Sequence, residues 1–184
     1  MSETIPITVR PMRSGEFATM RALSIAAFED DAQIGEVLDL LHESWAWEDG
    51  LSFVAESAGE LVGQVLYSHA MLDAPKRTVD VLVLGPIGVR PDLQRRGVGS
   101  KLVTASLAAL QDRDEPLVFL EGHPSYYPRF GFQLGVDLGF TAPSVRIPRE
   151  AFMVYPLPAH EPWMTGALVY PDAFWRADAV GLRK

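Results

Sequence analysis

The spacing of hydrophobic positions near the start of the chain predicts one strand and two helices. Apolar and polar residues alternate over 5–10, the pattern of a strand with one buried face. Apolar residues recur at three- and four-residue steps over 17–27 and again over 34–41, which indicates two helices with a buried stripe each. Ser14 and the pair Asp30–Asp31 precede these stripes and are the expected N-caps.

Strand patterns fill the middle of the chain. The segments 51–56 and 61–71 are joined by a short link that contains Gly59, which is typical of a β-hairpin. The segment 79–89 has the strongest strand pattern and is apolar on both faces, so it should lie in the middle of a sheet. Another apolar strand is expected over 116–121.

A third helix and a proline-rich tail complete the predicted order. Apolar residues line one side of 97–113, which predicts a helix between two strands. Prolines are frequent farther on, so the tail 133–184 should be rich in loops, with a strand over 152–157 that completes the sheet. The order of elements, without an internal repeat or a long linker, indicates one mixed α/β domain over 1–184 with its core in 5–132.

Composition narrows the class of protein. The chain has 184 residues, of which 48% are hydrophobic and 22% charged, as in a single globular domain. It has no cysteine, which excludes disulfides, thiolate metal sites and a cysteinyl intermediate, and no metal is expected. The net charge of −8 argues against nucleic-acid binding and is compatible with a cationic substrate. Because we find no secretory signal and no apolar run of membrane length, we expect a cytoplasmic protein without a membrane partner.

A glycine-rich turn at 94–100 is the most informative local feature. The predicted central strand runs into this turn, and the turn runs into a helix that opens with Gly97-Val98-Gly99. A helix N-terminus has unpaired N–H groups and a positive dipole end, and glycine lets an anion approach the backbone closely. With Arg95, Arg96 and Lys101 nearby, the pattern indicates a pyrophosphate site. The alternative is a helix cap whose glycines serve close packing.

Two other phosphate motifs do not fit this turn. A P-loop requires G-x-x-x-x-G-K-[ST], and a dinucleotide fingerprint requires a third glycine where Leu102 stands. Gly85-Pro86 lies inside the predicted central strand, and proline there removes a ladder hydrogen bond and marks a bulge. A strand interruption next to a phosphate turn suits a ligand with an amide arm and a pyrophosphate, and coenzyme A has both.

Two motifs resemble those of the GCN5-related N-acetyltransferase (GNAT) family. The run 94–99 matches the family's Q/R-x-x-G-x-G/A motif for acetyl-CoA, and 127–132 resembles its Tyr-x-x-x-Gly-Phe segment. The run 122–132 and pieces of the tail are similar to a subgroup of bacterial acetyltransferases. The resemblance implies an α/β fold with a mixed, mostly antiparallel sheet and helices on both faces. It also implies a split between the strands 79–89 and 117–121, where acetyl-CoA enters.

The same resemblance implies the reaction and the cofactor contacts. The protein would be an N-acetyltransferase that moves an acetyl group from acetyl-CoA to an amine of a small molecule or peptide. An edge strand in the tail could pair two chains as a homodimer. The pantetheine arm would bind the strand backbone at Ile87, Gly88 and Val89. The pyrophosphate turn would begin at Gln94, and its contacts are expected from Arg95, Arg96, Gly97, Val98, Gly99 and Ser100.

Acetyl transfer needs a base for the amine and a donor for the departing thiolate. An alkylammonium has a pKa near ~10.4, so a neutral amine at pH 7 requires proton removal. The resemblance puts the hydroxyl of Tyr127 near the thioester sulfur, with Tyr126 as the adjacent rival. A phenol pKa near ~10 and a thiol pKa near ~8.5 make full proton transfer uphill by ~2 kcal/mol, so a hydrogen bond is expected first. Glu121 and His123 are the candidate bases, and a backbone N–H such as that of Val89 is the candidate oxyanion donor.

Several alternatives stay open from the sequence. In a chain without cysteine, direct attack of the amine in a ternary complex is the expected route. The asparagine that many family members carry before the tyrosine is replaced by Leu120, and His123 or Ser125 would have to serve instead. A non-catalytic acyl-CoA sensor on the same fold, or a phosphate- or nucleotide-binding module, would also use the Gly97 turn.

Overall fold

The protein is built around a mixed sheet. The computed structural model describes residues 6–29 and 31–182. Residue 5 of the predicted strand and the predicted cap Asp30 therefore lie outside the described residues. The strand order is β1-β2-β3-β4-β5-β8-β6, and β9 pairs with both β3 and β7. Within these residues only the β4–β5 and β7–β9 pairs are parallel, which confirms the predicted mixed, mostly antiparallel sheet. The strands are β1 (Thr8–Pro11), β2 (Ser52–Ser57), β3 (Glu60–Asp73), β4 (Thr78–Val89), β5 (Leu117–Glu121), β6 (Gln133–Leu134), β7 (Phe140–Thr141), β8 (Phe152–Pro156) and β9 (Gly166–Val169).

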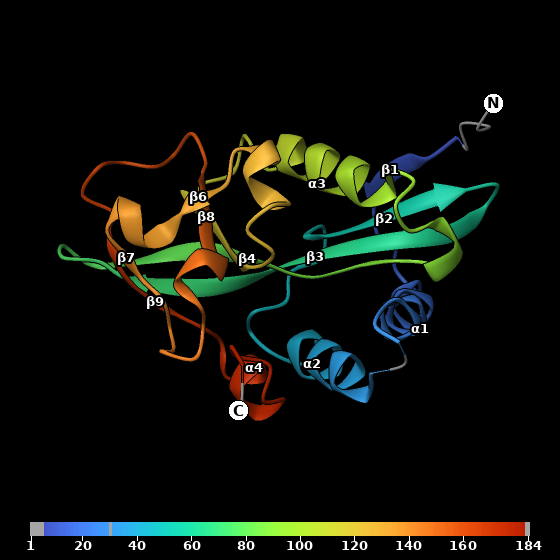
Figure 1. The fold of residues 1–184 in the computed structure, drawn as a ribbon, viewed down its shortest axis with the longest axis horizontal. Coiled ribbons are helices and arrows are strands. Elements are labelled where there is room, and N and C mark those ends of the chain that lie inside the picture. Colours follow the sequence, from blue (N-terminus) through green and yellow to red (C-terminus); the bar gives the residue numbers. More distant parts are fainter. Residues whose placement is uncertain (1–5, 30, 183–184) are drawn as a thin grey trace.

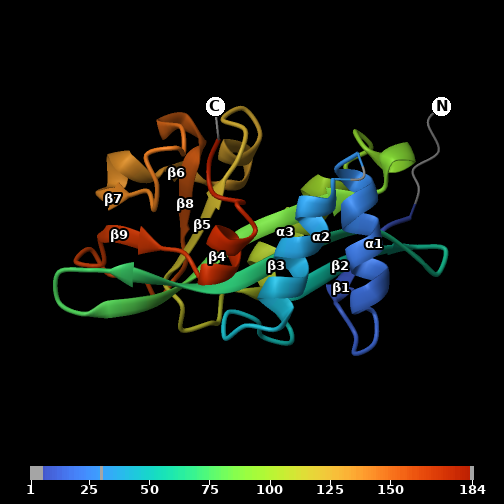
Figure 2. The same ribbon diagram turned by 90° about the horizontal axis from the view of Figure 1, so that it is seen from below.

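Helices cover both faces of the sheet, as predicted (Figure 1). α3 lies along one face, which we call the α3 face (Figure 1). α1, α2 and α4 lie on the other, the α1/α2 face (Figure 2). The helices are α1 (Phe17–Ala27), α2 (Ala32–His42), α3 (Val98–Ala109) and α4 (Asp172–Arg176), and the 3-10 turns are η1 (Pro91–Leu93), η2 (Tyr127–Phe130), η3 (Gly135–Leu138) and η4 (Arg149–Ala151).

The position of β4 explains why its sequence is apolar on both faces. Val81 and Val83 pack into the buried cluster under α1 and α2, whereas Leu82 and Leu84 pack into the cluster under α3. All four side chains are at most 4% exposed. β4 is therefore held between β3 and β5 with a hydrophobic layer on each side, and it gives the turn that follows a rigid base.

The predicted helix caps are confirmed in one case and wrong in the other. The Asp31 carboxylate accepts a hydrogen bond from the backbone N–H of Gln33 at 2.9 Å and caps α2 as expected. Ser14 does not cap α1. The N-cap position is Glu16, and its carboxylate bonds to the Arg10 guanidinium at 2.8 Å. No side chain caps α1, and the Glu16 carboxylate is engaged by Arg10 of β1 instead.

The tail after residue 132 is part of the sheet and of the buried core. β8 pairs with β5 over its whole length, which confirms the strand predicted over 152–157. Phe140, Phe152 and Tyr170 are at most 5% exposed and belong to the buried cluster under α1 and α2. The core thus extends beyond the predicted limit of 5–132. Figure 1 shows the tail gathered at the end of the sheet that carries β5, β8 and β6.

The ion pairs of Arg10 give the fold an acid-sensitive contact. Arg10 lies 2.8 Å from Glu16 and 2.7 Å from Glu56, and its hydrogen bond lowers the pKa of Glu16 from 4.5 to about 2. A carboxylate with a lowered folded-state pKa stabilises the fold above its unfolded pKa, and that contribution is lost as the pH falls from 4.5 towards 2. We expect Glu16→Gln to lower the unfolding free energy at pH 7 by about 1 kcal/mol after allowance for solvent screening. In denaturant titrations below pH 4.5, the variant should lose less stability than the wild type; an equal loss would contradict this assignment.

Candidate active site

The sheet opens where β4 leaves β5. The two strands pair at only two successive positions, the second being Val83 opposite Phe119. β4 runs on to Val89 along β3, and the β3–β4 register shifts opposite Gly85-Pro86, as expected for a bulge. Beyond Val83, one edge of β4 has no paired strand among the described residues. This opening, which we call the split, is the gap predicted between the strands 79–89 and 117–121.

The backbone of β4 beyond the bulge has an edge available for a ligand. Arg90 N–H donates to a carbonyl of β3 at 2.9 Å, and successive residues of a strand turn their backbone groups to opposite edges. Ile87 and Val89 therefore turn theirs towards the split, while Gly88 faces β3. The sequence assigns all three residues to the cofactor. Because Gly88 faces β3, its backbone does not face the split. Its lack of a side chain instead lets α1 pack closely on β4, since a Cβ at Gly88 would lie 3.0 Å from the Ala27 side chain.

The glycine-rich turn ends in an uncapped helix N-terminus. Gly97 is the N-cap of α3 with φ of +84°, a left-handed conformation that favours glycine, and no side chain caps the helix. The first helical hydrogen bond runs from Lys101 N–H to the Gly97 carbonyl at 3.0 Å. The N–H groups of Val98, Gly99 and Ser100 therefore have no partner within the helix. Together with the helix dipole they can hold an anion.

The side chains of this turn have two different roles: one holds the turn in place, and two carry positive charge at its surface. The Gln94 amide donates to the carbonyls of Val89 at 3.1 Å and Ala27 at 3.3 Å, so it fixes the turn to β4 and α1. Arg95 and Arg96 are exposed and belong to none of the ion pairs among the described residues, although Arg96 adds to the lowering of the Asp92 pKa that Arg90 mainly causes. Two guanidinium groups therefore remain beside the uncapped helix end, where a diphosphate would bind.

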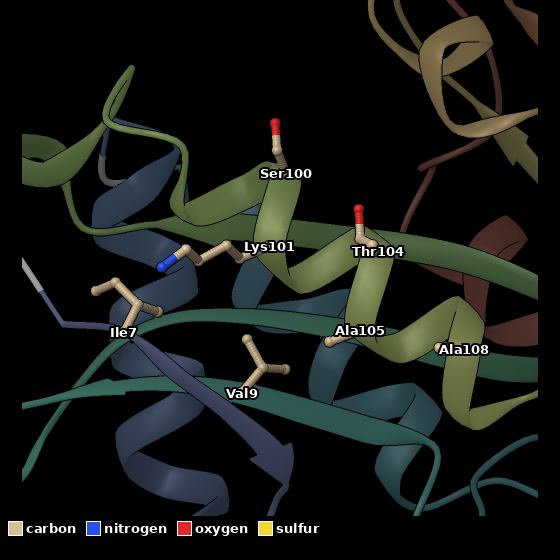
Figure 3. A pocket seen from close by; sticks show the side chains of 7 residues that line it. All are labelled: Ile7, Val9, Ser100, Lys101, Thr104, Ala105 and Ala108. Atoms are coloured by element: carbon tan, nitrogen blue, oxygen red, sulfur yellow. The ribbon is translucent and has the colours of Figure 1, made fainter. Parts of the chain in front are cut away.

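Lys101 lies on the β1 side of α3. Figure 3 shows its side chain extended towards Ile7, over a groove of about 510 Å³ between α3 and β1. The groove is lined on the helix side by small residues such as Ala105 and Ala108. The Lys101 ammonium therefore adds to the positive field at the start of α3 without facing the split.

Tyr127 is packed against the end of β5 on the α3 face. It is 8% exposed, and a Cβ on Gly122 would collide with Cε2 of its ring. Tyr67, which pairs with Leu84 where the split begins, is near enough to interact electrostatically with the Tyr127 phenol. Burial raises the pKa of Tyr127 to about 12. The hydroxyl therefore stays protonated and available as a hydrogen-bond donor.

The adjacent Tyr126 faces the glycine-rich turn. Its hydroxyl lies 3.0 Å from where a Cβ of Gly99 would stand, and the Arg129 guanidinium lies over its ring at 4.7 Å. The planes of the Tyr126 and Tyr127 rings meet at 88°. The two rings, whose centroids are 5.0 Å apart, pack edge to face, and the Tyr126 hydroxyl lies at the start of α3 while the Tyr127 ring packs against Gly122 at the end of β5.

Glu121 ends β5 on the face opposite to Tyr127. Side chains alternate along a strand, so Glu121 follows Leu117 and Phe119 on the α1/α2 face. Tyr127 belongs to the buried cluster under α3. The two residues therefore flank the same end of the split from opposite sides of the sheet.

The Glu121 carboxylate is half-buried and bonded to the tail. Gly181 N–H donates to its Oε2 at 3.0 Å, and the Tyr170 hydroxyl also donates to this carboxylate. Burial raises the pKa of Glu121, against the opposing effects of these two donors and of Arg146. A carboxylate with a raised pKa at the edge of a binding site is suited to accept a proton. Tyr170 belongs to a piece of the tail that is similar to the bacterial subgroup, but the sequence holds no signal that Tyr170 or Gly181 contacts Glu121, because both lie far along the chain.

His123, the other candidate base, is exposed and bonded within its own loop. Its Nδ1 accepts from Ser125 N–H at 3.3 Å and lies 2.9 Å from the Ser125 hydroxyl. Leu120 is fully buried on the α3 face. The two residues that could replace the family's asparagine, His123 and Ser125, are thus bonded to each other.

A separate charged cluster lies between the residues after α3 and the loop after α2. His69 lies 2.7 Å from Glu48 and 3.6 Å from Glu115, and Arg113 bridges the two carboxylates at 2.9 and 2.7 Å. The ligand atoms of the two glutamates and the histidine lie within 4.8 Å of one another. Arg113, however, already supplies the positive charge that a metal ion would bring. The cluster fixes the turn after α3, and the helix ends before the predicted residue 113.

Sequence comparison associates the chain with one family. Residues 8–135 match the family described as Acetyltransferase (GNAT) domain. The chain is 31% identical over 157 residues to the uncharacterized N-acetyltransferase YjhQ of Escherichia coli (strain K12), a match that covers 83% of this chain and 86% of YjhQ. It is 32% identical over 128 residues to the mycothiol acetyltransferase of Streptomyces bingchenggensis, covering 66% of this chain but 39% of that protein.

Two solved structures share the fold along most of the chain. The GNAT family N-acetyltransferase YhbS from Escherichia coli, in complex with CoA, has a TM-score of 0.80 with 24% identity over 96% of both chains. A GNAT family acetyltransferase from Brucella melitensis, in complex with acetyl-CoA, has a TM-score of 0.72 with 28% identity, covering 92% of this chain and 98% of that one. In the part of the chain that the structure describes, no helix is long and apolar enough to cross a membrane.

Proposed function

The chain belongs to the GNAT family of acetyltransferases and is an acetyl-CoA-dependent N-acetyltransferase, and from this premise we propose that the split is its catalytic centre. The observation that carries the proposal is the position of Glu121 and Tyr127 on opposite faces of the sheet at the end of β5. A thioester in the split would lie between a base on the α1/α2 face and a hydroxyl donor on the α3 face. Neither a non-catalytic sensor nor a nucleotide-binding module gains support from these relatives.

Backbone groups are proposed to hold the acetyl-CoA cosubstrate. The pantetheine amides would pair with the backbone of Ile87 and the N–H of Val89 along the edge of β4 that no strand covers, since the Val89 carbonyl already accepts from Gln94. The pyrophosphate would sit on the N–H groups of 98–100, with Arg95 and Arg96 beside it. The fit of acetyl-CoA rests on two backbone features that lack a hydrogen-bonding partner among the described residues. One is the edge of β4 beyond Val83, which pairs with no strand, and the other is the uncapped N-terminus of α3.

The reaction is direct attack of an amine on the thioester carbonyl. The incoming ammonium first gives one proton to the Glu121 carboxylate, which frees the nitrogen lone pair for attack, and the second proton leaves the nitrogen after the N–C bond forms and ends on the CoA sulfur. The N–H of Ile87 donates to the thioester carbonyl oxygen as this oxygen gains negative charge, because Ile87 carries the first strand N–H after Pro86. From the sequence alone, the N–H of Val89 is the candidate for this donor. The C–S bond then breaks, and the Tyr127 hydroxyl donates a hydrogen bond to the departing thiolate.

The acceptor is an amine of a small molecule or a peptide that enters from the α1/α2 face. Glu121 is on that face, and the net charge of −8 attracts a protonated amine towards the protein. After attack, the acetylated amine leaves by the same side, while CoA stays along β4 and the glycine-rich turn.

A coenzyme titration tests the binding part of this proposal. Acetyl-CoA and CoA should each stabilise the fold by about 2.7 kcal/mol at a hundred times the Kd, and ATP should not. Thermal-shift titration measures this difference. Gly97→Ala should remove most of the coenzyme shift, because a Cβ strains this left-handed residue and stands where the phosphate approaches.

The matched control for this variant is Gly59→Ala in the β2–β3 turn. Gly59 has φ of +81° against +84° for Gly97, and both have open space around them. The two substitutions therefore carry similar backbone strain, but only one lies at the proposed pyrophosphate turn. Equal loss of the coenzyme shift in both variants, or a shift with ATP as large as with CoA, would count against the proposed site.

A further inference from the structure

The carboxylate of Glu121 is held by the tail of the chain. Two donors reach it from beyond β9: the hydroxyl of Tyr170 and the backbone N–H of Gly181, the latter at 3.0 Å from Oε2. Tyr170 is 5% exposed, and its hydroxyl is near enough to this carboxylate to oppose the rise of its pKa. A buried tyrosine hydroxyl aimed at the end of a neighbouring strand fixes the orientation of the group it bonds.

We infer that Tyr170 and Gly181 are positioning residues for Glu121, and that the segment 170–182 serves to set the orientation and proton affinity of this base. The inference rests on the proposed role of Glu121. Neither residue lines the split itself. Both act on acetyl transfer through the carboxylate that they hold, so their effect should follow the ionisation of Glu121 rather than the binding of acetyl-CoA.

The segment is itself fixed at two places, so it can act as a rigid support. Gly181 adopts φ of +61°, and a Cβ there would lie 2.6 Å from the backbone carbon of Arg146. Leu182 N–H donates to the Arg146 carbonyl at 3.1 Å. At the other end, the Gln33 amide of α2 donates to the carbonyls of Ala177 and Asp178 at 2.9 and 3.0 Å. The close contact with Arg146 requires glycine at position 181.

The charges around Glu121 determine how the donors act. The titratable groups that influence it within the described residues are Tyr170 and Arg146, and the Gly181 N–H is its backbone donor. All three favour the carboxylate form, while burial favours the protonated form and dominates. Burial and the neighbouring carboxylate also raise the pKa of Tyr170, so its hydroxyl remains a donor throughout the working pH range.

Removal of the Tyr170 hydroxyl tests the inference. Tyr170→Phe keeps the ring and its packing but removes one donor, so the pKa of Glu121 should move to higher pH. The carboxyl carbon of Glu121, assigned by its loss in Glu121→Gln, reports this shift in a carbon-13 NMR titration without any acceptor. The acid limb of kcat/KM should move in the same direction, so that kcat/KM falls at pH values below the shifted pKa while KM for acetyl-CoA stays unchanged.

A second variant covers the case in which Tyr170→Phe folds poorly. Gly181→Ala forces the backbone away from Arg146 and lengthens the N–H contact with Glu121, so it should shift the same titration upward. Tyr155→Phe on β8 is the control for loss of a tyrosine hydroxyl, because Tyr155 packs on the α3 face and should leave the titration and the rates unchanged.

The outcomes separate this inference from the proposed function. If Glu121→Gln removes the acid limb but Tyr170→Phe and Gly181→Ala leave the Glu121 titration at its wild-type position, the positioning role is wrong and the base assignment stands. If Glu121→Gln keeps the acid limb and full activity, the proposed base is wrong. An upward shift in both tail variants, absent in Tyr155→Phe, supports the inference.

Discussion

Glu121→Gln is expected to lower kcat/KM for acetyl transfer by about a hundredfold, because a positioned general base contributes ~10²–10⁴-fold. The amide has nearly the size of the carboxyl group but cannot take a proton from the amine. In the wild type, kcat/KM should fall as the pH drops through the pKa of Glu121, which burial raises above its ordinary 4.5. Below that pKa the carboxyl is protonated and inactive as a base. The variant should lack this acid limb in steady-state rates measured across pH with the best acceptor from an amine panel.

Glu56→Gln is the matched control for this substitution. Glu56 is also a half-buried glutamate at the end of a strand, but it lies on β2 and pairs with Arg10 at 2.7 Å. It should keep the wild-type rate and pH profile. A Glu121→Gln enzyme that retained the acid limb and wild-type kcat/KM would assign proton removal to another group.

The parts of the fold that can be predicted from the sequence carry strong local signals. β4 is a long strand with apolar residues on both faces, and the β2–β3 hairpin has a short link with glycine at Gly59. β6 and β7, by contrast, have two residues each, too few for any alternation to be visible. Ser14 is predicted as a cap from its residue type alone, whereas the N-cap position of α1 is Glu16, whose side chain forms no cap and pairs with Arg10 of β1.

The residues of the candidate site likewise fall into those with a local sequence signal and those without one. The glycine-rich turn is local, so the identity and order of its residues are enough to indicate an anion site at Gly97. The neighbours of Glu121 are not local: Gly181, which bonds to it, is 60 residues away in sequence. The spacing of the family motif favours Tyr127 over Tyr126 but does not show where each side chain points. Tyr126 precedes the 3-10 turn η2, and only packing places its hydroxyl beside Gly99.

Tyr127→Phe should lower kcat by about tenfold or more and leave KM for acetyl-CoA unchanged. With a pKa of about 12, full proton transfer from this phenol to a thiolate near ~8.5 would be uphill by about 5 kcal/mol, so the hydroxyl acts as a hydrogen-bond donor. A hydrogen bond to a charged group contributes ~1.5–3 kcal/mol, which corresponds to about ten- to a hundredfold in rate. The ring of Phe would keep the contact with Gly122, so the fold should be preserved. Initial rates at varied acetyl-CoA give kcat and KM, and thermal denaturation of the free protein checks that the fold is preserved.

Tyr126→Phe should change a different kinetic constant from Tyr127→Phe, so the two variants distinguish the roles of the neighbouring tyrosines. Its hydroxyl lies beside Gly99 at the start of α3, so its loss should raise KM for acetyl-CoA and leave kcat near the wild-type value. Tyr155→Phe, on β8 and outside the split, should change neither constant. If the fall in kcat appeared in Tyr126→Phe and was absent from Tyr127→Phe, the donor to the thiolate would be Tyr126, and the departing sulfur would lie at the glycine-rich turn rather than at the end of β5. Because the two variants remove the same atom from adjacent residues, this comparison locates the leaving group relative to β5 without a bound ligand.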